Sequence, residues 1–287
     1  MGAPDVAFSK QYQAQATLLS QQTVSRFEPC VQTDRNWTGE EKFYDQYASD
    51  SMVELMSRYA DTPIQQPDHR RRRVTPRYFV SNTLEDPQDA LQMLIDPKSI
   101  YMQAKMAAAA RQRDDVLIAA LGGTSYTGKT GATAVTFPAA QQVVSGSAGM
   151  TKAKILRAKR KLDAAEVEPS ERYASHAAAQ LEDLLLTTEV SSSDFNTVKA
   201  LVQGELTTWI GFKWIHTERL LTNGSSERLC YFWQRMGMQL AVQKEVEGRV
   251  DERNDKNYAW QVYLRMAIGA TRLEEARVVE VACVETS

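Results

Sequence analysis

The sequence predicts an α+β fold, and three observations support that prediction. After Pro97, the run to Leu121 contains no glycine or proline, so it favours one long helix. Apolar residues occupy every second position from Tyr258 to Ile268, which predicts a strand of about eleven residues with one buried face. The stretch ARVVEVACV, residues 276–284, is rich in β-branched residues and predicts a further strand.

The composition is that of a globular protein and excludes several classes. The chain has 287 residues, enough for one large domain or two moderate ones. No run of about 18 apolar residues is present, and the N-terminus lacks a basic region followed by an apolar one, so neither a membrane span nor an ordinary secretory signal is predicted. Because the net charge is −2, contact with nucleic acid would need a local basic patch.

The N-terminal part offers little material for a core of its own. Residues 1–35 are rich in Gln, Ser and Thr, which predicts an arm that becomes ordered against another surface, with a short surface helix from Phe8 to Val24 as the alternative. Residues 37–80 combine aromatic side chains with three prolines and few apolar residues. A long excursion of this kind is usually functional or docked on a partner.

Four consecutive arginines, Arg70 to Arg73, raise the question of nucleic-acid binding. The favoured interpretation is a solvated or salt-bridged strand that leads into Val74, Tyr78 and Val80, with ion pairs across a subunit interface included. Contact with phosphate is the minority alternative, because no aromatic stacking platform is interleaved with the arginines.

Two Asp-Pro pairs predict helix starts, since Asp is a good N-cap and Pro a good first residue. Asp86-Pro87 begins a short helix through Leu91 and Leu94. Asp96-Pro97 begins the long helix, which would extend about 38 Å at 1.5 Å per residue. Gly122 and Gly123 end it. Its small face, which permits close approach of another backbone layer, is formed by Ile100, Ala104, Ala107 and Ala108.

The segment from Gly123 to Thr130 matches the P-loop pattern G-x-x-x-x-G-K-[ST]. In a P-loop, Lys129 would bind terminal phosphates and Thr130 would ligate Mg²⁺. That site needs a strand before the loop and a helix directly after it. Here a helix precedes the loop and the β-branched run 131–138 follows it, so a hairpin with glycines at positive φ is favoured. Nucleotide binding through Gly123–Thr130 stays open as the alternative function.

The second half alternates helical and strand-like patterns. Thr151 begins a helix that runs to Asp163, and Ser191–Ser193 can cap another that ends near Gly204. Residues 207–220 alternate as a strand does, residues 244–256 are most simply a solvated charged loop, and Gly269 suggests a bulge or bend. In the first helix the expected inner residues are Ile155, Leu156 and Leu162, and the expected solvated basic residues are Lys152, Lys154, Arg157, Lys159, Arg160 and Lys161. Proximity to DNA is the minority interpretation of that basic face.

No catalytic, cofactor-binding or metal-ligating constellation is predicted. The cysteines Cys30, Cys230 and Cys283 are an odd number without short spacing, so a disulfide framework or zinc cluster is not expected, and a reducing compartment is the simplest location. The three histidines lack neighbours at metal-ligand spacing, and there is no nucleophile elbow G-x-S-x-G. The chain is therefore expected not to be an enzyme, with no catalytic, cofactor or metal residues.

Several stretches resemble one family, the major capsid proteins of tailed bacteriophages with the Hong Kong 97-type fold. The resemblance covers most of the chain from about residue 70 onward, and the N-terminal third matches mainly in layout. The stretches are RYFVSNTLEDPQD (77–89), DPKSIYMQAKMAAAARQRDDVLIAALGG (96–123), WIGFKWI (209–215) and DKNYAWQVYLRMAIGATR (255–272).

The resemblance implies a division of the chain into the parts of that fold. The long helix would be the spine of a peripheral domain, with the strand 257–268 packed beneath it, and residues 244–256 would lie near contacts between capsomers. The implied parts are an N-terminal arm (1–40), an extended loop lying on a neighbouring subunit (41–80), a peripheral domain with spine helix and hairpin (81–137), an axial domain (138–225), the return of the peripheral domain (226–272) and the C-terminal strand of the axial domain (273–287).

The resemblance also implies a function and partners. The chain would be a structural protein of the virion that self-assembles, as pentamers and hexamers, into the icosahedral head shell around double-stranded DNA, and assembly would take place in the cytoplasm of the bacterial host. A portal protein, a separate scaffolding protein and a decoration protein are the implied partners, with no membrane. A separate scaffold is expected because the chain shows no long charged, helical N-terminal extension.

Overall fold

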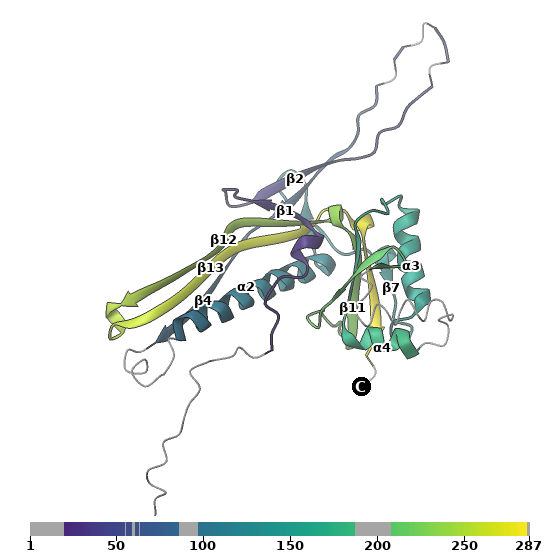
Figure 1. Ribbon diagram of the computed structural model, residues 1–287. Coiled ribbons are helices and arrows are strands. Elements are labelled where there is room, and N and C mark those ends of the chain that lie inside the picture. The colour runs from purple at the N-terminus through teal and green to yellow at the C-terminus, as the bar shows by residue number, and fades with distance from the viewer. Residues whose placement is uncertain are drawn as a thin grey trace, which may run out of the picture. The chain divides into compact units, whose positions relative to one another are not determined.

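A computed structural model describes residues 20–54, 56–58, 61–62, 64–85, 97–186 and 208–285 (Figure 1). The described residues form two compact units. One lies within 78–111 and 246–266, with the residues up to Val24, and the other lies within 25–77, 112–245 and 267–285. The helices expected at Asp86 and before Gly204, and most of the one at Phe8–Val24, fall outside the described residues. None of the described helices combines the length and hydrophobicity of a membrane span.

The long helix is confirmed as α2, Pro97–Gly122, with both of its predicted ends. Within the first unit its inner side meets strand β4, Arg77–Glu85, where Lys105 Nζ donates to Ser81 Oγ at 2.9 Å. Of the predicted small face, Ala107 is buried, whereas Ile100, Ala104 and Ala108 are only partly buried. In the second unit the last turns of α2 bury Leu117, Ile118 and Leu121 completely or almost so.

A four-stranded sheet has the order β1-β12-β13-β4 (Figure 1). Its strands are β1, Gln32–Arg35, β12, Met238–Arg253, β13, Ala259–Arg272, and β4. The expectation of a solvated loop at 244–256 is wrong, because β12 continues to Arg253 before a short 3-10 turn, η5, Asn254–Lys256. Its charged side chains pair along and across the strands, as Arg265 does with Glu247 at 2.8 Å, so the segment needs no apolar alternation to be a strand.

The β13 strand begins and ends at other residues than predicted. Tyr258 lies outside it with φ 57° and is exposed, whereas Val262, Leu264, Met266 and Ile268 are buried as predicted. Strand β13 continues through Gly269 to Arg272, so this glycine does not end the strand. A Cβ there would lie 2.7 Å from Val74 Cγ1 and 2.8 Å from the carbonyl oxygen of Thr75, so glycine is required by the close approach of another chain segment.

A six-stranded sheet in the second unit has the order β7-β14-β11-β8-β10-β9. Its central strand β11, Glu227–Gln234, is antiparallel to both neighbours, and its Trp233 packs between Phe27 and Tyr173 with ring centroids 5.4 and 5.8 Å away. The predicted final strand is confirmed as β14, Val278–Val284. The remaining strands are β7, Gln142–Val143, β8, Arg172–His176, β9, Thr208–Trp209, and β10, Phe212–His216.

Two further helices belong to the second unit, α3, Lys152–Ala164, and α4, Ala178–Leu186. Thr151 caps α3 as predicted, accepting from the Lys154 amide, and Ile155 and Leu162 are buried. Two assignments on this helix are wrong: Leu156 is 46 % exposed, and Lys154 is buried. The Lys154 Nζ donates to the carbonyls of Ala148, Gly149 and Ala282 at 2.7–3.0 Å, which compensates its burial while desolvation lowers its pKa.

Part of the predicted arm is built into the second unit. The buried carboxylate of Asp114 on α2 accepts from Ser25 Oγ at 2.6 Å and from the amides of Arg26 and Phe27 at 3.1 and 3.2 Å. Those bonds fix the residues just before η2, Glu28–Cys30, and the Phe27 ring lies in the core. Residues 25–35 are thus anchored to the end of the long helix and to the edge of β12.

Replacing Asp114 by Ala is expected to destabilise the protein by about 2–4 kcal/mol, because it leaves buried donors without their charged acceptor. The measurement is urea unfolding. Asp115→Ala is the matched control, since Asp115 and Arg219 are each about one-third exposed and their pair should contribute only about 0–1 kcal/mol. Equal losses for the two variants would contradict the anchoring role.

Acid should weaken the six-stranded sheet through His176. Burial first, and then the charges of His216 and Arg26, lower the pKa of His176 from 6.5 to about 3. The unfolded chain therefore binds a proton at this position that the folded chain does not. The contribution of His176 to the free energy of unfolding is fully present above pH 6.5, and the free energy falls by about 1.4 kcal/mol per pH unit below it. Urea unfolding of His176→Phe should show a shallower loss from about pH 6.5 to about pH 5, with little change of slope above about pH 7.5. An unchanged acid slope would contradict this assignment.

Candidate functional site: the basic sheet and its projecting segment

The arginine run lies on a strand of a third, antiparallel sheet in the second unit, as predicted. The sheet has the order β2-β3-β5-β6, with β2, Lys42–Tyr47, β3, His69–Val74, β5, Ser125–Thr127, and β6, Thr133–Val135. Arg71 lies opposite Asp45 of β2, and Arg72 lies opposite Thr127 of β5. Alternation along β3 sends Arg72 to the buried face and leaves Arg71 exposed.

Each arginine of the run is near a carboxylate in the same chain. Arg71 Nε donates to Asp45 at 2.6 Å, Arg73 pairs with Glu41 at 2.9 Å, and the exposed Arg70 lies 3.8 Å from Asp68. The predicted salt-bridged strand is therefore confirmed within the chain. Ion pairs across a subunit interface stay a prediction.

Arg72 joins a buried network that sequence reasoning missed. Its Nη2 donates to both carboxylate oxygens of Glu275 at 2.6 and 2.7 Å, and its Nε donates to the carbonyl of Leu273. The same Glu275 lies 3.7 Å from the fully buried Arg272. No signal in the sequence separates Arg272 from a surface arginine, because its acceptors come from residues about 150 positions away.

Arg272 is held by the end of α2. Its Nη1 donates to the carbonyls of Leu121 and Gly123 at 2.8 and 2.9 Å, and its guanidinium stacks over Phe137 at 4.8 Å. Desolvation lowers the pKa of Arg272, although Glu275 opposes that shift. Within the described residues Arg72 Nη1, Arg272 Nε and Arg272 Nη2 have no hydrogen-bond partner, so two buried guanidiniums share one carboxylate.

The segment that matches the P-loop pattern contains strand β5 and the start of the hairpin turn to β6, so the predicted hairpin is confirmed. Gly128 and Gly131 have φ of 97° and 64°, the left-handed region that glycine enters without strain. Helix α2 ends before the turn and strand β6 follows it, so no helix N-terminus faces the loop. Lys129 is exposed at the turn and makes no hydrogen bond or ion pair with the described residues.

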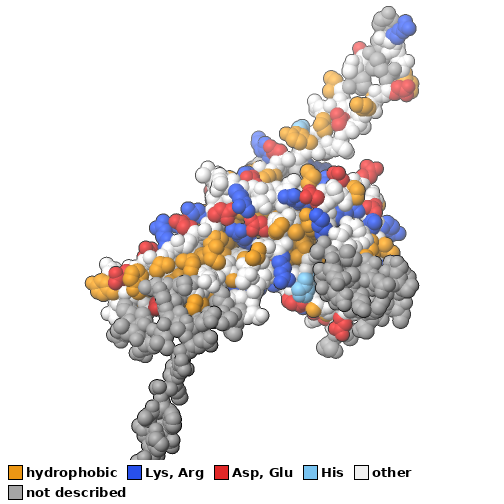
Figure 2. Space-filling view, in the orientation of Figure 1, with side chains coloured by type: hydrophobic (Ala, Val, Ile, Leu, Met, Phe, Trp, Pro, Cys, Tyr) orange, Lys and Arg blue, Asp and Glu red, His pale blue; other side chains and the backbone are white. Residues whose placement is uncertain are grey.

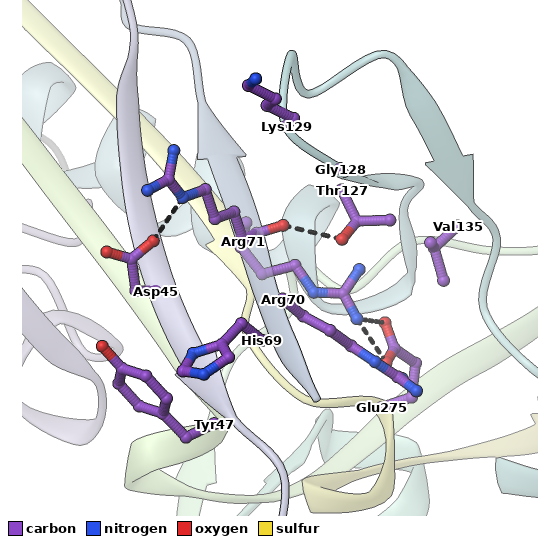
Figure 3. Close-up of a pocket in the computed structure, with 11 residues that line it drawn as sticks. Asp45, Tyr47, His69, Arg70, Arg71, Thr127, Gly128, Lys129, Val135 and Glu275 are labelled. Carbon is purple, nitrogen blue, oxygen red and sulfur yellow. Dashed lines mark hydrogen bonds and ion pairs between the residues drawn. The ribbon is translucent and has the colours of Figure 1, made fainter. Parts of the chain in front are cut away.

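Strands β2 and β3 and the hairpin enclose a cavity of about 660 Å³, which we call the arginine pocket (Figure 3). Asp45 and Arg71 meet on one wall, and Lys129 stands on the hairpin, pointing away from the other labelled side chains (Figure 3). Glu275, which accepts from Arg72, also lines the pocket. The lining residues are Asp45, Tyr47, His69, Arg70, Arg71, Arg72, Thr127, Gly128, Lys129, Val135 and Glu275.

The chain between β2 and β3, residues 48–68, projects from this sheet without helix or strand in its described residues (Figure 1). Its apolar side chains are uncovered. Met52 is 103 % exposed, Met56 90 % and Ile64 88 %. Figure 2 shows apolar side chains along this projecting segment. Apolar side chains in water are unfavourable, and uncovered apolar surface is a common property of interaction sites.

The histidines and cysteines do not assemble a reactive site in the described part of the chain. His176 and His216 are brought together on β8 and β10, with ring centroids 5.4 Å apart, while His69 is on β3. No group of three potential metal ligands occurs among the described residues. All three cysteines are free and buried, and burial raises the pKa of the Cys30 thiol to about 11.

Comparisons with known proteins agree with this architecture. A family model described as phage capsid protein matches residues 5–285. The capsid of Ralstonia phage GP4 superposes with a TM-score of 0.75 at 11 % identity over 98 % of this chain and 96 % of that one. The cyanophage P-SCSP1u capsid gives 0.74 at 14 % over 99 % and 94 %, and the cyanophage Pam1 capsid 0.74 at 14 % over 98 % and 97 %. No curated protein matches.

The fold is therefore that of a structural protein of a viral shell. The chain belongs to the phage capsid protein family. It is a structural major capsid protein with a Hong Kong 97-like fold, located in the capsid of the virion, as the resemblance predicted. Nothing in the comparisons supports nucleotide binding at Gly123–Thr130.

Replacing Glu275 by Gln is expected to cost about 3–5 kcal/mol of stability, because two buried guanidiniums would lose their shared carboxylate. The measurement is urea unfolding at constant pH. Asp45→Asn is the matched control: Arg71 and Asp45 are both about half exposed, so the loss there should be about 0–1 kcal/mol. A small loss in Glu275→Gln would show that other groups neutralise the buried arginines.

Proposed function

We propose that this capsid protein self-assembles as pentamers and hexamers into an icosahedral shell that encloses double-stranded DNA. The observation that carries the proposal is the uncovered apolar surface of residues 48–68, in a chain whose family builds capsids. Burying the side chains of Met52, Met56 and Ile64 against neighbouring copies would contribute roughly 5–9 kcal/mol before the cost of ordering them.

The parts of the fold receive proposed roles from the same reasoning. Residues 1–40 act as the N-terminal arm, 41–80 as the extended loop, and α2 with the sheet β1-β12-β13-β4 as the peripheral domain. The six-stranded sheet forms the axial domain. Because β11 lies inside that sheet, we place the return to the peripheral domain after Gln234 rather than at residue 226.

The remaining partners follow from the family resemblance. We propose a portal protein, a separate scaffolding protein and a decoration protein, with assembly in the cytoplasm of the bacterial host. The role is structural and not enzymatic. If Lys129 served nucleotide binding instead, the purified protein would bind Mg-ATP saturably and Lys129→Ala would abolish that binding.

Electron microscopy of the purified full chain at increasing concentration tests the proposal. Closed shells of uniform size are expected, formed by the protein alone or after a scaffolding protein is added. Particles that stay small under both conditions would contradict self-assembly.

The variant carrying Met52→Ser, Met56→Ser and Ile64→Ser should fold with wild-type stability, within about 0.5 kcal/mol, since these side chains are uncovered in the isolated subunit. Its shells should be strongly reduced in electron micrographs. The control variant Ser57→Ala with Thr62→Ala changes polar positions of the same segment and should assemble normally. If the triple variant formed normal shells, residues 48–68 would not be part of the interface between subunits.

A further inference from the structure

The described residues that line the arginine pocket carry more positive than negative charge. Besides His69, its lining contains four basic side chains, Arg70 to Arg72 and Lys129, and two carboxylates, Asp45 and Glu275. Glu275 is also shared with Arg272, which lies outside the lining and is fully buried. The described residues around the pocket therefore leave an excess of positive charge next to buried guanidiniums. Such an excess is unfavourable unless an anion neutralises it.

The unneutralised groups are placed where an incoming anion can meet them. Lys129 is exposed on the hairpin and has no partner among the described residues. Arg70 is 67 % exposed and forms only a long ion pair, 3.8 Å, with the exposed Asp68. Deeper in the site, Arg72 is 5 % exposed at its side chain and its Nη1 is unpartnered in the described structure.

The dimensions and the charges of the pocket favour a single acidic side chain over nucleic acid. The cavity of about 660 Å³ is concave and bounded by the hairpin, whereas a duplex presents its phosphates along a convex rod. Asp45 and Glu275 in the lining would repel a polyanion more than one carboxylate. Arginine already pairs with a planar carboxylate through two bonds in this pocket, between Arg72 and Glu275, so the local chemistry suits that group.

We propose that the arginine pocket binds a carboxylate of another copy of this chain, and that Lys129 on the hairpin is its specific contact. The proposal rests on the proposed self-assembly. The position supports it, because strands β2 and β3 both line the pocket and both lead into residues 48–68, whose apolar side chains are uncovered. The surface for a second copy is then continuous, apolar along the segment and basic at its base.

Carbodiimide crosslinking of assembled shells tests the contact directly, since the reagent joins an amine only to a carboxylate in contact with it. We expect covalent dimers on denaturing gels, with peptides linking Lys129 to Asp or Glu of another copy, absent from unassembled subunits. Lys129→Arg keeps the charge but removes the amine, so it should form shells and lose that crosslink. Wild-type shells in which Lys129 is linked to no other copy would overturn the proposal.

Charge reversal gives an independent readout. Lys129→Glu should raise the subunit concentration needed for half-maximal assembly about tenfold or more, because a carboxylate would then face a carboxylate. Arg160→Glu, the same charge change at an exposed position of α3, is the control and should shift it less than about twofold. Equal shifts would overturn the proposal.

Two further outcomes distinguish a carboxylate from a phosphate in the pocket, and the pocket from shell formation itself. If Lys129 is protected from amine acetylation only in DNA-filled heads and not in empty shells, the anion is a phosphate of the packaged nucleic acid and the carboxylate assignment is wrong. If the wild-type chain forms no shells with or without scaffold, the proposed function itself fails. Shells in which Lys129 is not crosslinked would overturn only the proposed role of the arginine pocket and would leave the proposed self-assembly intact.

Discussion

The second unit depends on one carboxylate, Glu275, placed between two buried arginines from different strands. Arg72 brings the base of the projecting segment to it, and Arg272 brings the end of β13, which in turn is fastened to the last carbonyls of the long helix. Burying two guanidiniums with one carboxylate is costly, so the arrangement persists only because the carbonyl acceptors and Phe137 share the desolvated charge. As a result, β3, β13, α2 and the hairpin are fixed to one another at a single point.

The attachment at Glu275 explains how residues 48–68, which form no regular structure in their described part, can still dock on another molecule. Residues 48–68 contain no described helix or strand, but both of their ends enter strands of a sheet that is tied to Glu275. The entropy lost when the segment docks is reduced by this tethering, and the uncovered apolar side chains then supply the favourable term. The anchoring of Ser25–Phe27 by Asp114 does the same for the N-terminal residues, whose described part joins the core.

The elements that sequence predicts well are those with local signals. Pro97 and Gly122 define the ends of the spine helix, the order of helix, glycine turn and strand argues against a P-loop, and the apolar alternation identifies β13. The errors occur where tertiary context decides. Residues 244–256 lack alternation because charged pairs stabilise that strand, and Lys154 is buried because three backbone carbonyls converge on it. The close approach of Val74 and Thr75 to Gly269 likewise has no local signal in the sequence. Arg272 could not be found because its acceptors lie about 150 residues away in sequence.

Assembly of a shell needs both strong attraction and a defined register, and these come from different groups. Apolar side chains of the projecting segment bind without direction, so alone they would tolerate several placements of a neighbour. A charged pocket at the base of the same segment discriminates among placements, because only one placement brings an anion to Lys129 while the others leave that charge uncompensated. The moderate energy of an exposed ion pair suits the selection of one placement. Because such a contact binds weakly, misplaced subunits can dissociate and bind again in another placement.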